Sequence, residues 1–165
     1  MDDAGKPDID ELEEPRPGHG GRFVPADFRL PKPPRTDRFW LEPLGPQHND
    51  ADYAAWGSSI EHILATPGFQ HARWPHPMPV EENLSDLVRH AEHFRRRLGF
   101  TYTVRDTTTD DVLGCVYIYP DEDPNLSARV RSWVRASHAD LDLLLAFVVQ
   151  DWLDKEWPFT TVRFR

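Results

Sequence analysis

ARVRSWVRASHADLD, residues 128–142, contains the change of pattern that decides the fold. Apolar and polar side chains alternate from Val130 to Arg135, as they do in a strand. From Asp140 to Glu156, apolar residues recur at spacings of three and four, which predicts a helix. A loop between a strand and a helix can bind phosphate, because backbone N–H groups and the positive helix end point there. This loop contains no glycine, so its capacity to hold a phosphate is in question.

The residues around this stretch predict a mixed sheet. Two strands precede it, Phe100 to Arg105 and Val112 to Tyr119, and short turns should join all three strands as an antiparallel meander. Pro158 ends the long helix, and Phe159 to Phe164 reads as a last strand. This final β–α–β step should place the last strand parallel to the strand at Val130, through a right-handed crossover.

The first half of the body predicts one strand and two helices. Phe39 and Leu41 alternate with polar neighbours in a first strand, and His48 to Leu64 has helical spacing that Gly57 can interrupt. Val80 to Leu98 predicts the second helix, whose apolar stripe comprises Leu84, Leu87, Val88, Ala91, Phe94 and Leu98. The element order is therefore β, α, α, β, β, β, α, β, and the predicted class is α+β.

Composition excludes several classes of function. The chain has 165 residues and a formal net charge of −9, and an acidic surface does not attract nucleic acid or anionic lipid. No stretch approaches the about 18 apolar residues of a membrane span, and the acidic N-terminus does not resemble a secretion signal. We therefore expect a cytoplasmic protein. The single cysteine, Cys115, lies in an apolar run, which favours a buried core residue over a nucleophile.

Proline and glycine divide the chain into two regions. The first 36 residues hold seven of the 16 prolines and four of the nine glycines. We interpret residues 1–36 as a tail, disordered over residues 1–22, that continues as an extended arm. Residues 37–165 form one predicted domain.

Three stretches and the order of the elements resemble the GNAT family of acyl-CoA-dependent N-acetyltransferases. RFWLEPL, residues 38–44, is similar to the family's first strand, and VLGCVYIYP, residues 112–120, is similar to its third, where a leucine–glycine pair is common. Val130 to Val134, followed by Leu141 to Leu153, is similar to its fourth strand and main helix. The resemblance covers residues 37–165. It implies a GNAT-like fold, acetyl-CoA as co-substrate, and acetyl transfer to a small-molecule amine by direct attack in a ternary complex.

The resemblance also places the cofactor's pyrophosphate over the loop after the fourth strand, where the family pattern is Q/R-x-x-G-x-G/A. Arg135 stands at the Q/R position, and His138 and Asp140 replace the glycines. The backbone amides should still meet the phosphates, but Asp140 would repel them by about 4 kcal/mol at an effective dielectric of about 20. Alternatively, Ser137 or Asp140 caps the helix. The expected cofactor-binding residues are Trp133, Val134, Arg135, Ser137, His138, Ala139 and Asp140.

Acetyl transfer needs a base, a donor for the thioester oxygen and an acid for the leaving thiolate. We expect Tyr117 or Tyr119 to be the acid, and Glu122, next to Asp121, to be the base through water. The backbone N–H groups of Trp133 to Arg135 are the expected oxyanion donors. The structural alternatives are that the carboxylates lie in an exposed turn and that the tyrosines pack in the core.

The loop FQHARWPHPMP, residues 69–79, is expected to line the acceptor site with His71, Trp74 and His76. Alternatively, Trp74 packs over the helices and the histidines are solvated. His90 and His93 are three residues apart on a predicted helix, but no third ligand has a suitable spacing, so no metal site is predicted.

The chain ends before a further helix and two strands that the family usually has, which leaves the last strand as an open edge. We expect a homodimer partner or the N-terminal arm to cover that edge. The alternative to an enzyme is a catalytically inactive GNAT-like module for ligand binding or dimerisation.

Overall fold

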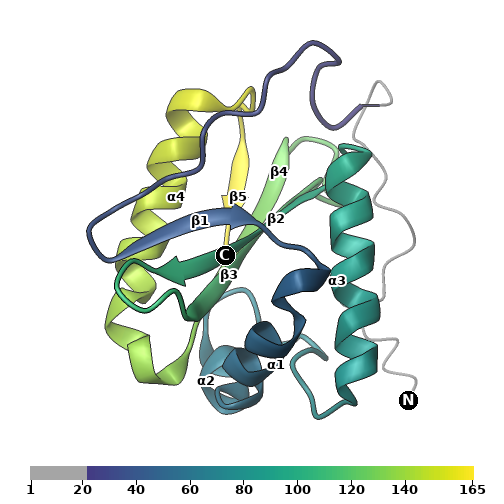
Figure 1. Ribbon diagram of the computed structural model, residues 1–165. Helices are drawn as coiled ribbons and strands as arrows, with labels where there is room; N and C mark the ends of the chain where they lie inside the picture. Colours follow the sequence, from purple (N-terminus) through teal and green to yellow (C-terminus); the bar gives the residue numbers. More distant parts are fainter. Residues whose placement is uncertain (1–21) are drawn as a thin grey trace.

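The computed structural model describes residues 22–165, which contain one mixed five-stranded sheet (Figure 1). The strands lie in the order β1 (Phe39–Pro43), β2 (Phe100–Asp106), β3 (Val112–Tyr119), β4 (Ala128–Val134) and β5 (Val162–Phe164). The first three pairings are antiparallel, and β5 lies parallel to β4. The predicted α+β class, meander and parallel step are therefore confirmed.

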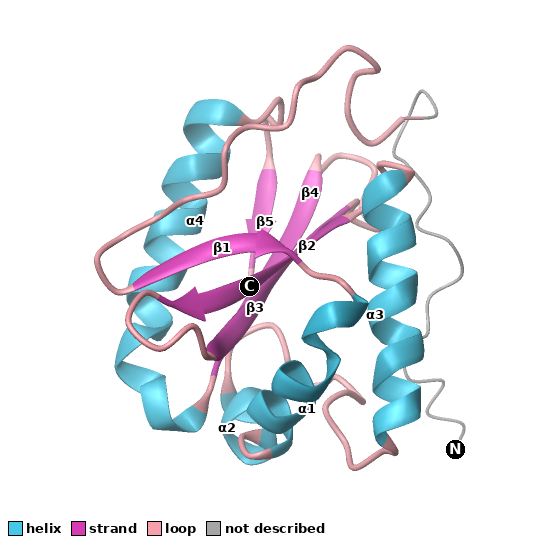
Figure 2. Cartoon of the chain, in the orientation of Figure 1, coloured by secondary structure: helices cyan, strands magenta, loops and turns pink. Residues whose placement is uncertain are grey.

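Helices cover both faces of the sheet (Figure 2). One face carries η2 (Pro46–His48), α1 (Asn49–Gly57), α2 (Ile60–Ala65) and α3 (Val80–Arg95), whereas α4 (Asp142–Glu156) packs on the other. Along β3, Tyr117 and Tyr119 join the core under the first set of helices, and Val116 and Ile118 join the core under α4. Because both of its faces are buried, β3 is apolar almost throughout.

All three predicted helices have different bounds in the structure, and the one expected from Val80 to Leu98 ends at Arg95. The helix expected from His48 to Leu64 is divided into α1 and α2, because the chain turns at Ser58 and Ser59. The helix expected from Asp140 begins at Asp142, since the residues before it form the 3₁₀ helix η3 (Ala136–Leu141). The Ser59 hydroxyl accepts the Ala136 N–H at 2.9 Å, and this bond joins the α1–α2 turn to the start of η3.

The apolar stripe predicted for α3 does not face the sheet as a whole. Leu84 and Val88 are 40% and 49% exposed. The residues of α3 that are buried are Asn83, Leu87, His90 and His93. The side chains that α3 meets on β3 carry hydroxyl groups, so a polar helix face can satisfy them. On α4, Leu143 and Phe147 are likewise exposed, although Leu145 and Val149 are buried as predicted.

The segment before β1 packs on the body. Val24 is buried in the core under α4, and Phe23, Phe28 and Leu30 pack against that core. Arg97 fixes the segment by donating to the carbonyl oxygen of Phe28 at 2.7 Å. The arm expected here therefore adds apolar contacts to the sheet, while residues 1–21 of the tail lie outside the described part of the chain. Cys115 is buried, as predicted.

The turn between β2 and β3 gives stability that depends on pH. Asp106 Oδ1 accepts the N–H groups of Thr108 at 2.7 Å and Thr109 at 3.1 Å, and these bonds lower the pKa of the Asp106 carboxyl. A lowered pKa in the folded state stabilises the protein above the unfolded value of about 3.9, and this gain is lost as pH falls through the folded value.

We expect Asp106→Asn to remove this contribution at neutral pH and to leave stability nearly unchanged at the lowest pH. Urea unfolding of both proteins between pH 6 and the acid limit of solubility measures it. A constant difference between the two proteins across that range would contradict the assignment.

Candidate functional site

One edge of β4 is unpaired beyond the end of β5. The parallel ladder joins Ala128–Val130 to Val162–Phe164, and the Arg165 N–H donates to the Val130 carbonyl oxygen at 2.8 Å. Within residues 22–165, no strand pairs with the rest of β4 on this side. Because alternate residues of a strand direct their N–H and C=O groups to the same side, the main chain of Ser132 and Val134 faces the unpaired edge. We call this stretch, residues 131–134, the open edge.

One of the three amides predicted to bind the thioester oxygen, the Arg135 N–H, already has a partner within the sheet. It donates to the Leu113 carbonyl oxygen at 2.7 Å, on the opposite side of β4. By the same alternation, the Trp133 N–H faces β3, and the Val134 N–H faces the open edge. The Val134 N–H is therefore the one of the three that faces the open edge.

Two buried polar atoms beside the open edge have no hydrogen-bond partner among the described residues. They are Ser132 Oγ and Arg135 Nε. The Arg135 guanidinium makes one long contact, from NH1 to the Val112 carbonyl oxygen at 3.4 Å. A buried polar group without a partner costs about 1–3 kcal/mol, so such groups are candidates for contact with a ligand.

The glycine-free loop forms η3, and several of its amides are used within the protein. The Ala136 N–H donates to Ser59, the His138 N–H donates to the Arg135 carbonyl oxygen at 2.9 Å, and the Asp142 N–H donates to the Ala139 carbonyl oxygen. Fewer main-chain donors are therefore left for a phosphate than the sequence suggested.

The carboxylates of this loop pair with arginines. Asp140 contacts Arg38 at 3.3 Å, and Asp142 contacts Arg165 at 2.5 Å. Neither η3 nor α4 has a side-chain cap, so the predicted capping by Ser137 or Asp140 is wrong. The Ser137 hydroxyl instead lies 2.9 Å from His138 Nδ1.

Arginines concentrate on β4, β5 and the adjoining loop, although the chain as a whole is acidic. They are Arg129, Arg131, Arg135, Arg163 and Arg165. Some are partly neutralised, since Arg163 pairs with Asp121 and Arg165 with Asp142. The sequences of β4 and β5 contain no acidic residue. This local excess of positive charge favours an anionic ligand.

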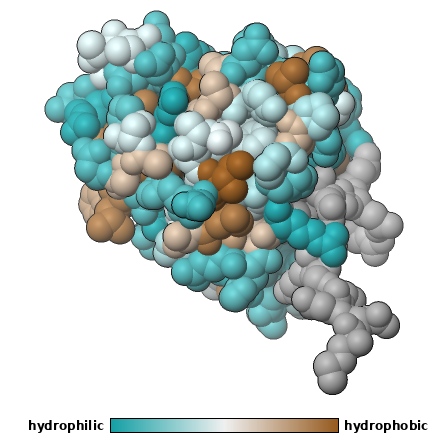
Figure 3. Space-filling model, turned by 90° about the horizontal axis from the view of Figure 1, so that it is seen from below, coloured by the Kyte–Doolittle hydropathy of each residue, from teal (hydrophilic) through white to brown (hydrophobic). Residues whose placement is uncertain are grey.

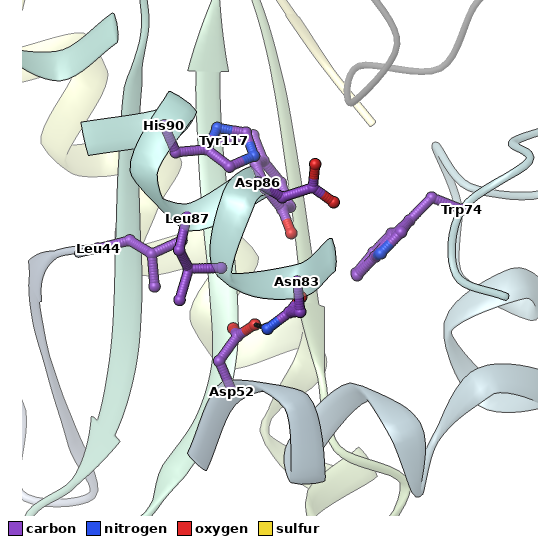
Figure 4. A pocket seen from close by; sticks show the side chains of 8 residues that line it. All are labelled: Leu44, Asp52, Trp74, Asn83, Asp86, Leu87, His90 and Tyr117. Atoms are coloured by element: carbon purple, nitrogen blue, oxygen red, sulfur yellow. Dashed lines mark hydrogen bonds between the residues drawn. The ribbon is translucent and has the colours of Figure 1, made fainter. Parts of the chain in front are cut away.

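A small cavity lies under α3 on the opposite face of the sheet from α4 (Figure 4). Its walls come from α1, α3, β3 and two loops, and the lining residues are Leu44, Asp52, Trp74, Asn83, Asp86, Leu87, His90 and Tyr117. The space at its centre is about 10 Å³, which is room for about one water molecule.

Hydrogen bonds hold the cavity walls in place. Asn83 Nδ2 donates to Asp52 Oδ2 at 3.2 Å, and Asn83 Oδ1 accepts from Trp56 Nε1 at 3.1 Å. Trp133 Nε1 donates to the Tyr117 hydroxyl at 3.0 Å. The last bond connects the cavity to β4, because Trp133 is part of that strand.

Tyr119 lies beside this cavity and is held by α3. Its hydroxyl is 2.8 Å from His90 Nδ1 and 3.0 Å from His93 Nδ1, and Thr101 Oγ1 is 3.1 Å from His90 Nδ1. A tyrosine hydroxyl donates one hydrogen bond and can accept two, so it can donate to one imidazole and accept from the other. The two histidines, three residues apart, therefore position a tyrosine. In residues 22–165, no group of three or more His, Cys, Asp or Glu could hold a metal ion.

The structure brings together only some of the residues predicted for catalysis and acceptor binding. Tyr117, Tyr119 and Trp74 are buried on the same face of the sheet. His71 and His76 are exposed, and Glu122 is exposed in the β3–β4 turn, at the opposite end of β4 from η3. These three residues remain predictions that the geometry does not bring together.

Sequence reasoning missed the four charged or polar residues Asp52, Asn83, Asp86 and His90 of the cavity wall. The signal that could have found the three on α3 is its second stripe, where polar residues recur at positions 83, 86 and 90 beside the apolar stripe. Both stripes have helical spacing, so spacing alone did not tell which one faces the sheet.

The face of the protein seen from below offers no large apolar surface. Figure 3 shows small apolar groups on this face that hydrophilic side chains separate. No helix in residues 22–165 has the length and apolar character to cross a membrane. A homodimer and a cytoplasmic location therefore stay predictions.

The sequence matches no protein-family model, and no curated protein matches it either. Solved structures do resemble the fold. A ribosomal L7/L12 α-N-protein acetyltransferase has a TM-score of 0.58 at 14% identity, over 79% of this chain and 67% of its own. The ribosomal-protein-S5-alanine acetyltransferase from Vibrio fischeri has a TM-score of 0.57 at 15% identity, over 76% of this chain and 68% of its own.

A third structure was solved with acetyl-CoA and AMP, that of the microcin C7 self-immunity acetyltransferase. It has a TM-score of 0.52 at 12% identity, over 72% of this chain and 64% of its own. Other matched chains are described as GNAT acetyltransferases, among them one from Bordetella pertussis. At these identities the similarity establishes a shared fold.

Proposed function

Starting from the GNAT fold of this chain, we propose that it is an N-acetyltransferase that moves an acetyl group from acetyl-CoA to the amine of a small molecule. The observation that carries this proposal is the open edge of β4, which leads from the end of β5 toward the start of α4. A strand edge with unpaired N–H and C=O groups can pair with the amides of an extended ligand. The acyl-CoA arm has such amides.

The residues present fit acetyl-CoA, although they hold it differently from a glycine-rich loop. Ser132 and Val134 offer main-chain groups at the open edge, and Arg135 Nε is a buried donor in need of an acceptor. Ser137 and His138 lie on the first turn of η3, where a phosphate would arrive. Asp140 forms an ion pair with Arg38, and the positive charge of Arg38 offsets the repulsion between the Asp140 carboxylate and that phosphate. Acetyl-CoA supplies an activated acyl group as a thioester.

In this proposal the amine nitrogen forms a bond to the acyl carbon, and the bond from that carbon to sulfur breaks. The Val134 N–H is the donor to the thioester oxygen. Tyr117 accepts a hydrogen bond from Trp133, and it is the candidate acid for the thiolate because a phenol O–H can donate a proton. Tyr119 is the second candidate. Glu122 stays the proposed base through water, and the neighbouring Asp121 is paired with Arg163.

A binding module without catalysis is the second candidate function. The observation that favours it is the use of loop amides within the protein, together with two carboxylates at the start of α4. Such a module would bind an acyl-CoA or another anion weakly and would not catalyse acetyl transfer.

Titration with acetyl-CoA separates these functions, and we expect a single site with thermal stabilisation. At a hundredfold excess over Kd, the gain is about 2.7 kcal/mol. Arg135→Ala should weaken binding about tenfold, the size expected for a hydrogen bond to a charged group. Isothermal titration calorimetry measures both effects.

The matched control is Arg95→Ala, since Arg95 is exposed at the end of α3 and pairs with Glu92. Its affinity for acetyl-CoA should equal that of the wild type. No binding at millimolar acetyl-CoA would exclude both the enzyme and an acyl-CoA-binding module. Binding without release of CoA in the presence of an amine panel would favour the module.

A further inference from the structure

Three arginines project from one face of the sheet where β4 and β5 meet. Arg129 and Arg163 are partners in the parallel ladder, and Arg131 lies two residues farther along β4. Residues i and i+2 of a strand point to the same face, and neighbouring strands lie about 4.8 Å apart. Arg129 is also the register partner of Tyr119, which belongs to the core under α1 and α3. The three side chains therefore lie on the α1–α3 face, and we call them the arginine group.

Arg129 is the member of this group whose charge has no partner in the described part of the chain. Its side chain forms no hydrogen bond or ion pair there, and its Nε atom is buried. Arg163, in contrast, forms a two-point ion pair with Asp121, with Nε and Oδ2 at 2.9 Å and Nη2 and Oδ1 at 3.3 Å. The nearby Asp123 accepts hydrogen bonds from Asn125 instead. One half-buried positive charge is therefore left without a counter-ion among the described residues.

The loop expected to line the acceptor site reaches the arginine group. Arg131 Nη1 donates to the Gly68 carbonyl oxygen at 3.0 Å, and the Arg131 guanidinium carbon lies 5.2 Å from the centre of the Phe69 ring. Phe69 is the first residue of the loop 69–79. These contacts fix Arg131 and join the loop to β4 where the open edge begins. A ligand between this loop and the open edge would therefore lie within reach of Arg129, two residues back along β4.

The charges of the arginine group favour a carboxylate as the ligand. A guanidinium can bind a carboxylate through two parallel hydrogen bonds, and such charge-assisted bonds are stronger than neutral ones. The pair of Asp121 and Arg163 shows that this geometry is formed on the strand next to Arg129. A carboxylate carries one negative charge and so matches the one unpaired guanidinium, whereas a phosphate dianion would exceed it.

The position of Arg129 also sets the shape of the ligand. Arg129 precedes Val134, the proposed donor to the thioester oxygen, by five residues, which is about 17 Å along a strand. The long arginine side chain can cover part of this distance. A ligand that spans the rest is an extended chain, and a compact amino acid would be too short.

We propose that Arg129 binds the carboxylate of an extended amino acid, and that the amine at the other end of the same molecule is the acetyl acceptor. Arg131 and Arg163 flank the carboxylate and add positive charge. The transfer is the step described above, in which the nitrogen loses a proton and the thiolate gains one. The assignment of a carboxylate site stands on the arginine group itself. The role of its ligand as acceptor rests on the proposed acetyltransferase function.

The test is a calorimetric titration of the full chain with 8-aminooctanoate in the absence of acetyl-CoA. We expect saturable binding that added salt weakens. The analogue 8-amino-1-octanol keeps the amine and the chain but has no carboxylate, and it should bind at least about tenfold more weakly. Arg129→Gln removes the charge and should weaken binding of 8-aminooctanoate by about tenfold or more. Arg129→Lys restores the charge without the planar fork and should recover part of the affinity.

The matched control is Arg29→Gln, since Arg29 is exposed on the segment before β1, and it should leave binding unchanged. Asp121→Asn tests the group in the opposite direction, because it removes the counter-ion of Arg163 but keeps an acceptor oxygen for the Asp123 N–H. It should strengthen binding about two- to fivefold. Far-UV circular dichroism shows whether each variant is folded. If Arg129→Gln does not fold, the comparison of the two probes on the wild type and the effect of Asp121→Asn decide.

Equal binding of the two probes, no saturable binding of 8-aminooctanoate, or unchanged affinity in folded Arg129→Gln would each overturn the carboxylate site. Because these titrations contain no acetyl-CoA, they do not depend on the proposed function. Binding of 8-aminooctanoate by a protein that does not bind acetyl-CoA would keep the site and remove its role in acetyl transfer. Acetyl-CoA binding without binding of 8-aminooctanoate would do the reverse. If both bind, the two together should release CoA, and no release would overturn the acceptor role.

Discussion

Gly114→Ala is expected to lower the free energy of unfolding by about 3 kcal/mol or more. A Cβ on this residue would lie 2.0 Å from the Trp133 carbonyl oxygen and 3.1 Å from the Trp133 carbonyl carbon. Both are backbone atoms of β4, so no side-chain rotation relieves the clash. β3 and β4 would have to separate where Gly114 pairs with Val134, in the middle of the sheet. Urea unfolding followed by circular dichroism measures the loss.

The control is the same substitution at Gly57, the last residue of α1. A Cβ there would meet no atom within 4 Å, so Gly57→Ala should leave stability unchanged or raise it by up to about 1 kcal/mol. Domains are stable by only about 5–15 kcal/mol, which makes the contrast easy to measure. Equal stability of the two variants would show that β3 and β4 are not as close at Gly114 as described.

Trp133→Ala is expected to cost about 3–5 kcal/mol, the range for removing a buried tryptophan. The side chain is fully buried, and its ring lies 6.0 Å from that of Trp74. The substitution also removes the donor to the Tyr117 hydroxyl. It should therefore loosen the wall of the cavity under α3 as well as the core. Urea unfolding followed by circular dichroism measures the loss.

Trp133→Phe separates packing from the hydrogen bond. It keeps an aromatic ring but removes the indole N–H, so the expected loss is smaller, about 1–3 kcal/mol. Tyr117→Phe in the same background completes a double-mutant cycle, and the interaction energy should be about 0.5–3 kcal/mol because the two groups are in contact. An additive cycle would mean that the indole–phenol bond does not contribute to stability.

The order and type of the elements could be predicted because each strand alternates with period two or is continuously apolar, and each long helix repeats at three to four. Val112 to Tyr119 was predicted with its observed bounds. Bounds failed where a tertiary contact intervened. Ser59, in the turn between α1 and α2, accepts a hydrogen bond from Ala136, the first residue of η3. Such a contact joins residues far apart in the chain, so local spacing does not reveal it.

The candidate site was less predictable than the fold. Trp74 was predicted to lie in the acceptor site, and it does line the cavity, but its burial among other aromatic rings is equally the packing alternative. The role of His90 depends on the tyrosine hydroxyl opposite it on β3, which places a polar face of α3 inward. Side-chain pairing across elements decides these roles, and one sequence does not contain that information directly.

The bond between Ser59 and Ala136 has a mechanical consequence. The second amide after β4, that of Ala136, is bonded to the turn between α1 and α2, in the same helical layer that walls the cavity under α3. If a bound anion shifts η3, either the hydrogen bond between Ser59 and Ala136 breaks or the turn between α1 and α2 moves with η3. Through that single hydroxyl, a ligand bound beside β4 and η3 would alter the width of the cavity under α3 without touching it.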